Sequence, residues 1–205
     1  MLHDADIREP LFDFLEETYG KIRILEEKNT GRSRADVVMV TENAVCGVEI
    51  KSDADSYQRL SGQVKDYDRY YDRNFVAVGT KHAGSIEEHV PPHWGIITVD
   101  EVDGKPDFYI LRLPKSNPGI KLTRKLSILW RPELVHIQEH FDMPRYKDKS
   151  KEFVIEKIAV RTAYPPDKKG YIDPGELAKA ISSELFERDY NTIEAEIKAY
   201  RKAKR

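Results

Sequence analysis

The sequence predicts an α/β fold in which helices flank a small mixed sheet and a helical extension follows. Three observations predict it. An amphipathic stretch opens the chain, three short apolar runs follow it closely, and a second amphipathic stretch separates them from two more apolar runs. The expected order of the core is therefore helix, three strands, helix and strand, αβββαβ, plus a further strand.

The first helix is expected over residues 4–18, because apolar residues recur there every three or four positions and Gly20 follows as a stop signal. Residues 21–27 alternate between apolar and polar side chains, which favours a strand. The polar stretch 28–34 contains turn-forming residues and is interpreted as a loop.

Two apolar runs at 37–40 and 45–51 are the second and third strands, and the four residues between them suit a hairpin. Residues 53–72 are expected to form the second long helix. Its apolar face carries a stripe at helical spacing: Tyr57, Leu60, Val64, Tyr67 and Tyr71.

The apolar runs 75–80 and 94–99 are interpreted as buried strands, and 107–113 as an edge strand. Between the two buried strands, Ser85 is expected to cap a short helix. A composition break at 115–119, rich in Pro, Gly, Ser and Asn, marks the expected domain boundary, giving domains 1–114 and 115–205.

The extension is expected to be helical because helix-start signals recur along it. The expected starts are at Pro132, at Ser150, at Asp173 with Pro174 behind it, and at Asn191.

Composition limits the class of protein. The 205 residues carry a net charge of −2, so nucleic-acid binding would have to come from local basic patches. Cys46 is the single cysteine, which excludes an intrachain disulfide and favours a reducing cytoplasm. No apolar stretch is long enough for a membrane span, and no signal-peptide pattern is present, so no membrane partner is expected.

The chemistry-bearing residues lie at Asp36 and at Glu49-Ile50-Lys51. Side chains alternate along a strand, so Glu49 and Lys51 project from one face, and the hairpin brings Asp36 beside Glu49. Two carboxylates and a lysine converging at one end of a sheet suit a site for Mg²⁺ or Mn²⁺, with the lysine as water activator or charge stabiliser. A surface salt-bridge cluster is the simpler alternative.

This pattern resembles the PD-(D/E)XK nuclease superfamily, in which a strand carrying Asp precedes a strand ending in Glu-x-Lys. Gln63 and Tyr67 in the following helix are similar to the Gln-x-x-x-Tyr motif of its RecB-like and lambda-exonuclease-like branch. The resemblance implies a restriction-endonuclease-like core and a metal-dependent DNA nuclease, active in repair, recombination, phage replication or defence. It also implies that the main-chain carbonyl of Ile50 is a metal ligand.

The resemblance implies further roles for individual residues. Gln63 and Tyr67 would arrange the site and contact DNA, although core packing also explains Tyr67. Glu9 is the candidate for a first-helix metal ligand, but its spacing from Asp6 equally fits a capping box. Arg8 could instead hold a phosphate or a site carboxylate.

DNA contacts are expected from basic and polar residues around the site and in the extension: Arg32, Arg34, Ser61, Lys65, Lys149 and Lys151. The segment from Leu134 to Ile158 is similar to a SAP-type DNA-binding module, with an ordinary helical hairpin as the alternative. Two other functions remain open. One is a structure-selective nuclease acting on junctions, which favours a homodimer. The other is an inactive DNA-binding or adaptor protein that retains the fold.

Overall fold

The computed structural model describes residues 2–189. Its centre is a six-stranded mixed sheet in which the strands follow one another in chain order. Neighbouring strands are antiparallel from β1 to β3, parallel from β3 to β5, and antiparallel again between β5 and β6. The strands are β1 (Arg23–Thr30), β2 (Ser33–Val40), β3 (Val45–Lys51), β4 (Arg73–Gly79), β5 (Gly95–Val102) and β6 (Lys105–Arg112).

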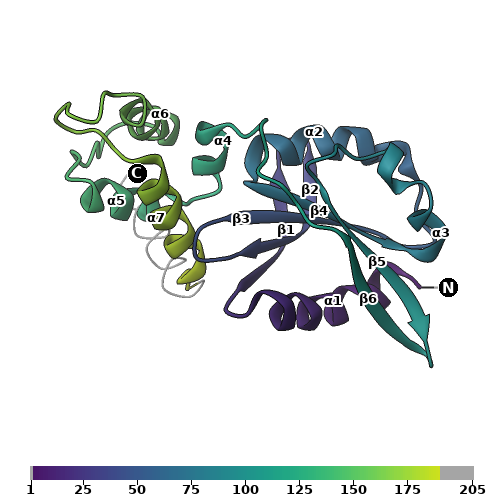
Figure 1. The fold of residues 1–205 in the computed structure, drawn as a ribbon. Helices are drawn as coiled ribbons and strands as arrows, with labels where there is room; N and C mark the ends of the chain where they lie inside the picture. The colour runs from purple at the N-terminus through teal and green to yellow at the C-terminus, as the bar shows by residue number, and fades with distance from the viewer. Residues whose placement is uncertain (1, 190–205) are drawn as a thin grey trace. The chain divides into compact units, whose positions relative to one another are not determined.

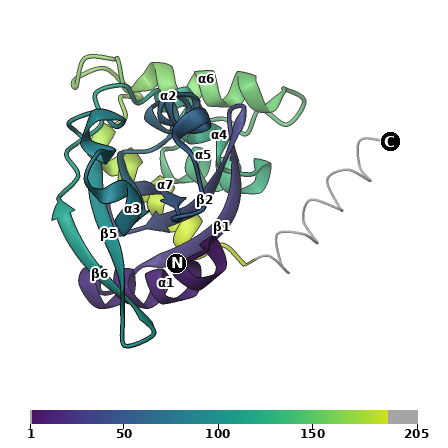
Figure 2. The same cartoon turned by 90° about the vertical axis from the view of Figure 1, so that its right-hand side faces the viewer.

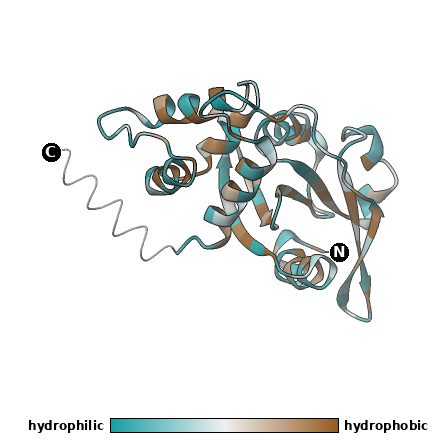
Figure 3. Ribbon diagram, turned by 60° about the vertical axis from the view of Figure 1, so that its left-hand side comes forward, coloured by the Kyte–Doolittle hydropathy of each residue, from teal (hydrophilic) through white to brown (hydrophobic). Residues whose placement is uncertain are grey.

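Two helices cover the opposite faces of this sheet, α1 (Asp4–Tyr19) on one and α2 (Leu60–Tyr70) on the other (Figure 1, Figure 2). The α1 helix buries Ile7, Leu11 and Leu15 against the sheet. Apolar residues are frequent along the strands of the sheet (Figure 3). All seven residues of β3 are buried, including the charged Glu49 and Lys51. The α/β class and the order αβββαβ with a further strand are confirmed.

The prediction of a loop over residues 28–34 is wrong. Strands β1 and β2 continue through it, and only a two-residue turn separates Thr30 from Ser33. The side chains at these strand ends are mostly polar, so the alternation of apolar and polar residues that predicts a strand is absent there. Gly31 makes the turn with a φ of +65°, a conformation that other residues rarely adopt.

The second long helix begins later than expected. Residues 53–56 form no helix, a 3-10 turn spans Tyr57–Arg59, and α2 begins at Leu60. Asp55 accepts hydrogen bonds from the backbone N–H and the hydroxyl of Ser52, which satisfies the chain locally without a helix. Ser85 likewise precedes only a single 3-10 turn, Ile86–Glu88, while a short helix that the sequence did not predict, α3 (Thr80–Ala83), lies before it.

The chain divides into two compact units, one that ends at Ile120 and a second that begins at Lys121. The second unit is helical: α4 (Leu122–Ser127), α5 (Arg131–His140), α6 (Lys151–Arg161) and α7 (Pro174–Phe186). Ser150 and Asp173 cap α6 and α7 through side-chain oxygens, as expected. The helix expected from Asn191 lies outside the described residues.

The second unit has its own buried ion pair. Arg188 donates to both carboxylate oxygens of Glu133, at 2.6 and 2.7 Å, and its guanidinium lies 4.3 Å from the centre of the Trp130 ring. Among residues 2–189, no helix is both long and apolar enough to cross a membrane.

Candidate metal and nucleic-acid site

The candidate site forms where β2 and β3 stop pairing. Their register runs from Val40 opposite Val45 to Val37 opposite Val48. One step further, the Asp36 side chain accepts the backbone N–H of Ile50 through Oδ2, at 2.9 Å. The carboxylate thus takes a donor that a continued ladder would have satisfied, and its other oxygen, Oδ1, lies 3.8 Å from Nη2 of Arg8.

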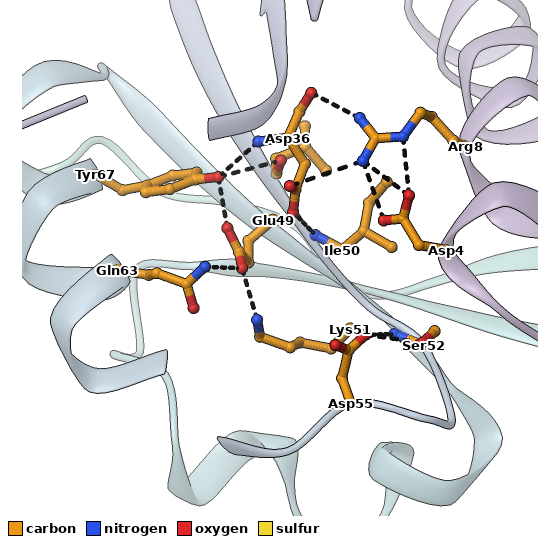
Figure 4. A network of polar contacts seen from close by, with 11 residues as sticks. Asp4, Arg8, Asp36, Glu49, Ile50, Lys51, Ser52, Asp55, Gln63 and Tyr67 are labelled. Atoms are coloured by element: carbon orange, nitrogen blue, oxygen red, sulfur yellow. Dashed lines mark hydrogen bonds and ion pairs between the residues drawn. The ribbon is translucent and has the colours of Figure 1, made fainter. Parts of the chain in front are cut away.

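Glu49 is the centre of the hydrogen-bond network (Figure 4). Its Oε1 accepts from Nζ of Lys51 at 2.7 Å and from the amide of Gln63. Its Oε2 accepts from the hydroxyl of Tyr67 at 2.7 Å. Glu49 and Lys51 are buried, with 1% and 3% of their surface exposed, so the simpler alternative of a surface salt bridge does not describe them.

Burial makes negative charge costly here. Burial, and after it the neighbouring Asp36 carboxylate, raise the pKa of Glu49 to about 7 against the opposing effects of Lys51 and Tyr67. Burial likewise raises the pKa of Asp36, while the hydrogen bond from Ile50 and the charge of Arg8 oppose the shift. Burial and neighbouring carboxylates, Asp36 for Glu49 and Asp4 for Asp36, disfavour the ionised form of both residues, so a cation bound nearby would stabilise that form.

Tyr67 belongs both to the core and to the site. Its ring is fully buried and packs against Tyr71 and Trp94, with centroids 5.4 and 5.5 Å away. Its hydroxyl accepts the N–H of Asp36 at 3.2 Å while donating to Glu49. Burial, followed by the charge of Glu49, raises the pKa of Tyr67, so it remains a neutral donor. Gly47 lies beneath the ring and leaves it room.

The first helix supplies Asp4 and Arg8 to the site, whereas the Glu9 side chain is exposed and does not line the cavity. The helix begins at Asp4, as expected, but its cap lies before Asp6. His3 is its N-cap, and the Asp6 side chain accepts the His3 N–H at 2.8 Å, so Asp6 ends the capping box that was expected to begin there. Asp4 was not identified from the sequence, although its i,i+4 spacing from Arg8 was a usable signal.

A cavity of about 1170 Å³ opens over the two carboxylates. Four residues expected to contact DNA line it, namely Arg32, Arg34, Ser61 and Lys65. Arg59 and Arg69 also line it and were not identified. The two lysines expected from the extension lie in the second unit. There Lys149 is exposed, whereas Nζ of Lys151 donates to the Ser127 carbonyl at 2.7 Å, which gives that lysine a structural role.

Asp66 of α2 holds the β1–β2 turn in place. Its Oδ2 accepts the backbone N–H of Arg32 at 3.1 Å and the hydroxyl of Ser33 at 2.7 Å. A Cβ on Gly31 would lie 2.7 Å from Oδ1 of Asp66, so the turn and the helix approach as closely as glycine permits. Asp66 therefore fixes the segment that carries Arg32 and Arg34 along the cavity.

The donor set fits a hard divalent cation. Within residues 2–189 no group of three or more His, Cys, Asp or Glu is arranged to hold a metal ion. Mg²⁺, however, often takes only one or two protein carboxylates and keeps several waters. Asp36 and Glu49 are placed to offer such carboxylates, and Oε1 of Gln63 is a buried oxygen for which the described part of the chain provides no hydrogen-bond partner. The candidate ligand atoms are all oxygens.

The model of the bacteriophage P4 protein cII family matches residues 2–164. This chain belongs to that family. The matched segment contains every residue of the site described above. Among curated proteins, no sequence matches significantly.

Among solved structures, SfsA from Pyrococcus furiosus in complex with Ca²⁺ is similar to this chain, with 15% sequence identity and a TM-score of 0.36. The likeness covers 58% of this chain and 65% of SfsA, just under two thirds of that protein. It carries no argument about activity, which has to come from the site.

Proposed function

We propose that this chain is a Mg²⁺- or Mn²⁺-dependent DNA nuclease of the PD-(D/E)XK type. One observation carries the proposal: the buried Glu49, paired with Lys51 and adjacent to Asp36, lies at the floor of a cavity bordered by arginines and lysines. Burying Glu49 and Lys51 beside a half-buried Asp36 is costly without a purpose. A cavity with basic walls and an acidic floor suits a phosphodiester whose backbone is held by cations.

The proposed division of roles follows from the contacts. Asp36, Glu49 and the Ile50 carbonyl would hold the metal, which when bound polarises a phosphoryl oxygen and lowers the pKa of a bound water. Lys51 is placed to orient that water and to offset charge developing on the phosphate. Gln63 and Tyr67 act through Glu49, because each donates to one of its oxygens and fixes its rotamer.

The DNA contacts are proposed to come from the cavity walls. Arg32 and Arg34 approach from the β1–β2 turn, and Ser61 and Lys65 from α2, so the phosphate backbone would lie between these two elements. The same proposal includes membership of the RecB-like and lambda-exonuclease-like branch, a preference for DNA junctions, and assembly as a homodimer. Comparing cleavage of different DNA substrates tests the preference, and the mass of the protein in solution tests the homodimer.

A second candidate is a DNA-binding protein that does not cleave. The observation that favours it is that both oxygens of Glu49 already accept hydrogen bonds, from Lys51, Gln63 and Tyr67. A carboxylate has about four lone-pair positions, so one remains for a metal. Binding without cleavage in the assay below would establish this candidate.

The decisive experiment measures cleavage of single-stranded, duplex and branched DNA with Mg²⁺ or Mn²⁺, and with excess chelator. Asp36→Asn and Glu49→Gln should lower turnover at least ~10³-fold, which corresponds to about 4 kcal/mol of lost transition-state stabilisation. Lys51→Ala should lower turnover ~10²–10⁴-fold while metal affinity changes little. Ca²⁺ should support DNA binding with little turnover, because it coordinates in a looser geometry.

Glu9→Gln is the matched control, because that carboxylate is exposed and outside the cavity. It should cleave at the wild-type rate. Cleavage that survives chelation, or near-normal turnover by Asp36→Asn or Glu49→Gln, would remove the basis of the proposal.

A further inference from the structure

Arg8 lies between two carboxylates of the site (Figure 4). Its Nε and Nη2 both donate to Oδ1 of Asp4, at 3.0 and 2.8 Å, and Nη2 also reaches Oδ2 at 3.1 Å. On its other side, Nη1 donates to the Asp36 carbonyl at 3.1 Å, and Nη2 lies 3.8 Å from Oδ1 of Asp36. The guanidinium thus bridges the first helix and the second strand of the sheet.

The local charge shows what this bridge does. Three carboxylates, those of Asp4, Asp36 and Glu49, are offset by two cations, Arg8 and Lys51, which leaves one net negative charge. One divalent cation converts this to one net positive charge. A second would bring the cluster to three positive charges and would have to displace a guanidinium held by bonds to Asp4 and Asp36.

Resting on the proposed function, we infer that Arg8 is a built-in second cation that restricts the site to one divalent metal ion. It takes the place between Asp4 and Asp36 where a second ion would otherwise find two carboxylates. Arginine suits this role because its guanidinium keeps its charge at every physiological pH and its planar fork matches a carboxylate. Only 18% of the side chain is exposed, so solvent screens the charge poorly.

The four-residue spacing explains how the device is built. Asp4 and Arg8 stand one turn apart on α1, whose Ile7 and Leu11 are fully buried in the core. Packing of that apolar stripe fixes the helix against the sheet. The charged pair beside it is thereby held at the point along β2 where pairing with β3 ends, with Arg8 over Asp36.

The test counts Mn²⁺ ions on the full chain by calorimetric titration and by the EPR signal of free Mn²⁺, without DNA. The wild-type protein should bind one ion. Arg8→Ala should bind two, the second at least about tenfold tighter than any second ion on the wild-type protein. Arg8→Lys keeps the charge and should bind one. Adding Asp4→Asn to Arg8→Ala removes a ligand of the second ion and should restore a count of one.

A purely structural role for Arg8 would change thermal stability but not these counts. Two ions on the wild-type chain would overturn the inference, as would a single ion bound with unchanged affinity by a folded Arg8→Ala variant. If Arg8→Ala does not fold, Arg8→Gln, which keeps hydrogen-bond donors without the charge, should give the count of two, and a count of one would overturn the inference. Cleavage is scored separately, so the expected counts without DNA cleavage would refute the nuclease and leave the inference standing. A wild-type chain that binds no Mn²⁺ would overturn both.

Discussion

The substitution Gly47→Ala tests how strongly the site depends on the packing of the core beneath it. Gly47 lies in the middle of β3 under two tyrosine rings. An added Cβ would stand 2.5 Å from Cδ2 of Tyr71 and 2.6 Å from Cδ1 of Tyr67. Neither ring has room to move, because Tyr67 packs on Trp94 and the Tyr71 hydroxyl lies 2.6 Å from that of Thr30.

The expected cost has two parts. Overpacking a rigid core costs about 1–3 kcal/mol. Pushing Tyr67 away from Glu49 weakens a buried, charge-assisted hydrogen bond worth about 1.5–3 kcal/mol. Because the displacement will break that bond only in part, Gly47→Ala should lower the free energy of unfolding by about 2–5 kcal/mol.

Gly62→Ala is the matched control. The same methyl group at that position in α2 has no atom within 4 Å, and alanine favours a helix over glycine by about 0.5–1 kcal/mol. Urea denaturation followed by tryptophan fluorescence, with Trp94 reporting on the first unit, measures both. The reasoning is refuted if the free energy of unfolding of Gly47→Ala lies within about 1 kcal/mol of the wild-type value, which is on the order of the extrapolation error. It is also refuted if Gly62→Ala is destabilised to the same degree.

Three further predictions follow from contacts elsewhere. Burial raises the pKa of Glu49 to about 7 from 4.5, so the folded chain binds its proton more tightly, and in chelator the free energy of unfolding should fall by about 3 kcal/mol as the pH rises from about 4.5 to 7. Glu49→Gln should lack this fall, and an unchanged pH slope would contradict the burial argument. Asp66→Ala should loosen the β1–β2 turn and weaken DNA binding several-fold, measured by fluorescence anisotropy, while the Mn²⁺ affinity stays unchanged. Asp66→Asn keeps an acceptor and should bind DNA more nearly as the wild-type protein does. Equal DNA affinity of all three proteins would refute this role of Asp66. Glu133→Ala leaves Arg188 buried without its carboxylate and should destabilise the second unit by about 3–5 kcal/mol, measured by hydrogen exchange in α5 and α7; protection equal to wild type would show that the ion pair is dispensable.

The sequence predicted the core because its strands are continuous apolar runs and its long helices have clear stripes. Glu49 and Lys51 could be placed on one face because strand alternation allows nothing else. The β1–β2 turn was missed for the opposite reason. Lys28, Asn29 and Thr30 are polar, and pairing with β2 holds them in a strand. The distant Asp66 holds the turn itself through Arg32 and Ser33, and no local pattern reveals either contact.

The first helix shows a second limit. The sequence offered Glu9 as its site carboxylate, but the phase of the helix, fixed by Ile7, Leu11 and Leu15, turns Asp4 and Arg8 toward the sheet. A capping box beginning at Asp6 was the alternative explanation of Glu9, but His3 is the N-cap and the box ends at Asp6. Neighbouring side chains on a helix point about 100° apart, so Arg8 faces the sheet while Glu9, one residue later, is exposed.

Asp36 has a structural task that is separate from its proposed part in chemistry. Beside any part in chemistry, its side chain accepts the Ile50 N–H at the point where two strands diverge. A related protein that had lost cleavage would still need an acceptor at position 36, because the Ile50 N–H would otherwise lack a hydrogen-bond partner. In such a protein, substitution of Asp36 by asparagine, which retains the acceptor oxygen, should therefore be tolerated better than substitution by an apolar residue. An aspartate at this position is accordingly weaker evidence of enzymatic activity than a lysine at position 51, whose ammonium satisfies no part of the backbone ladder.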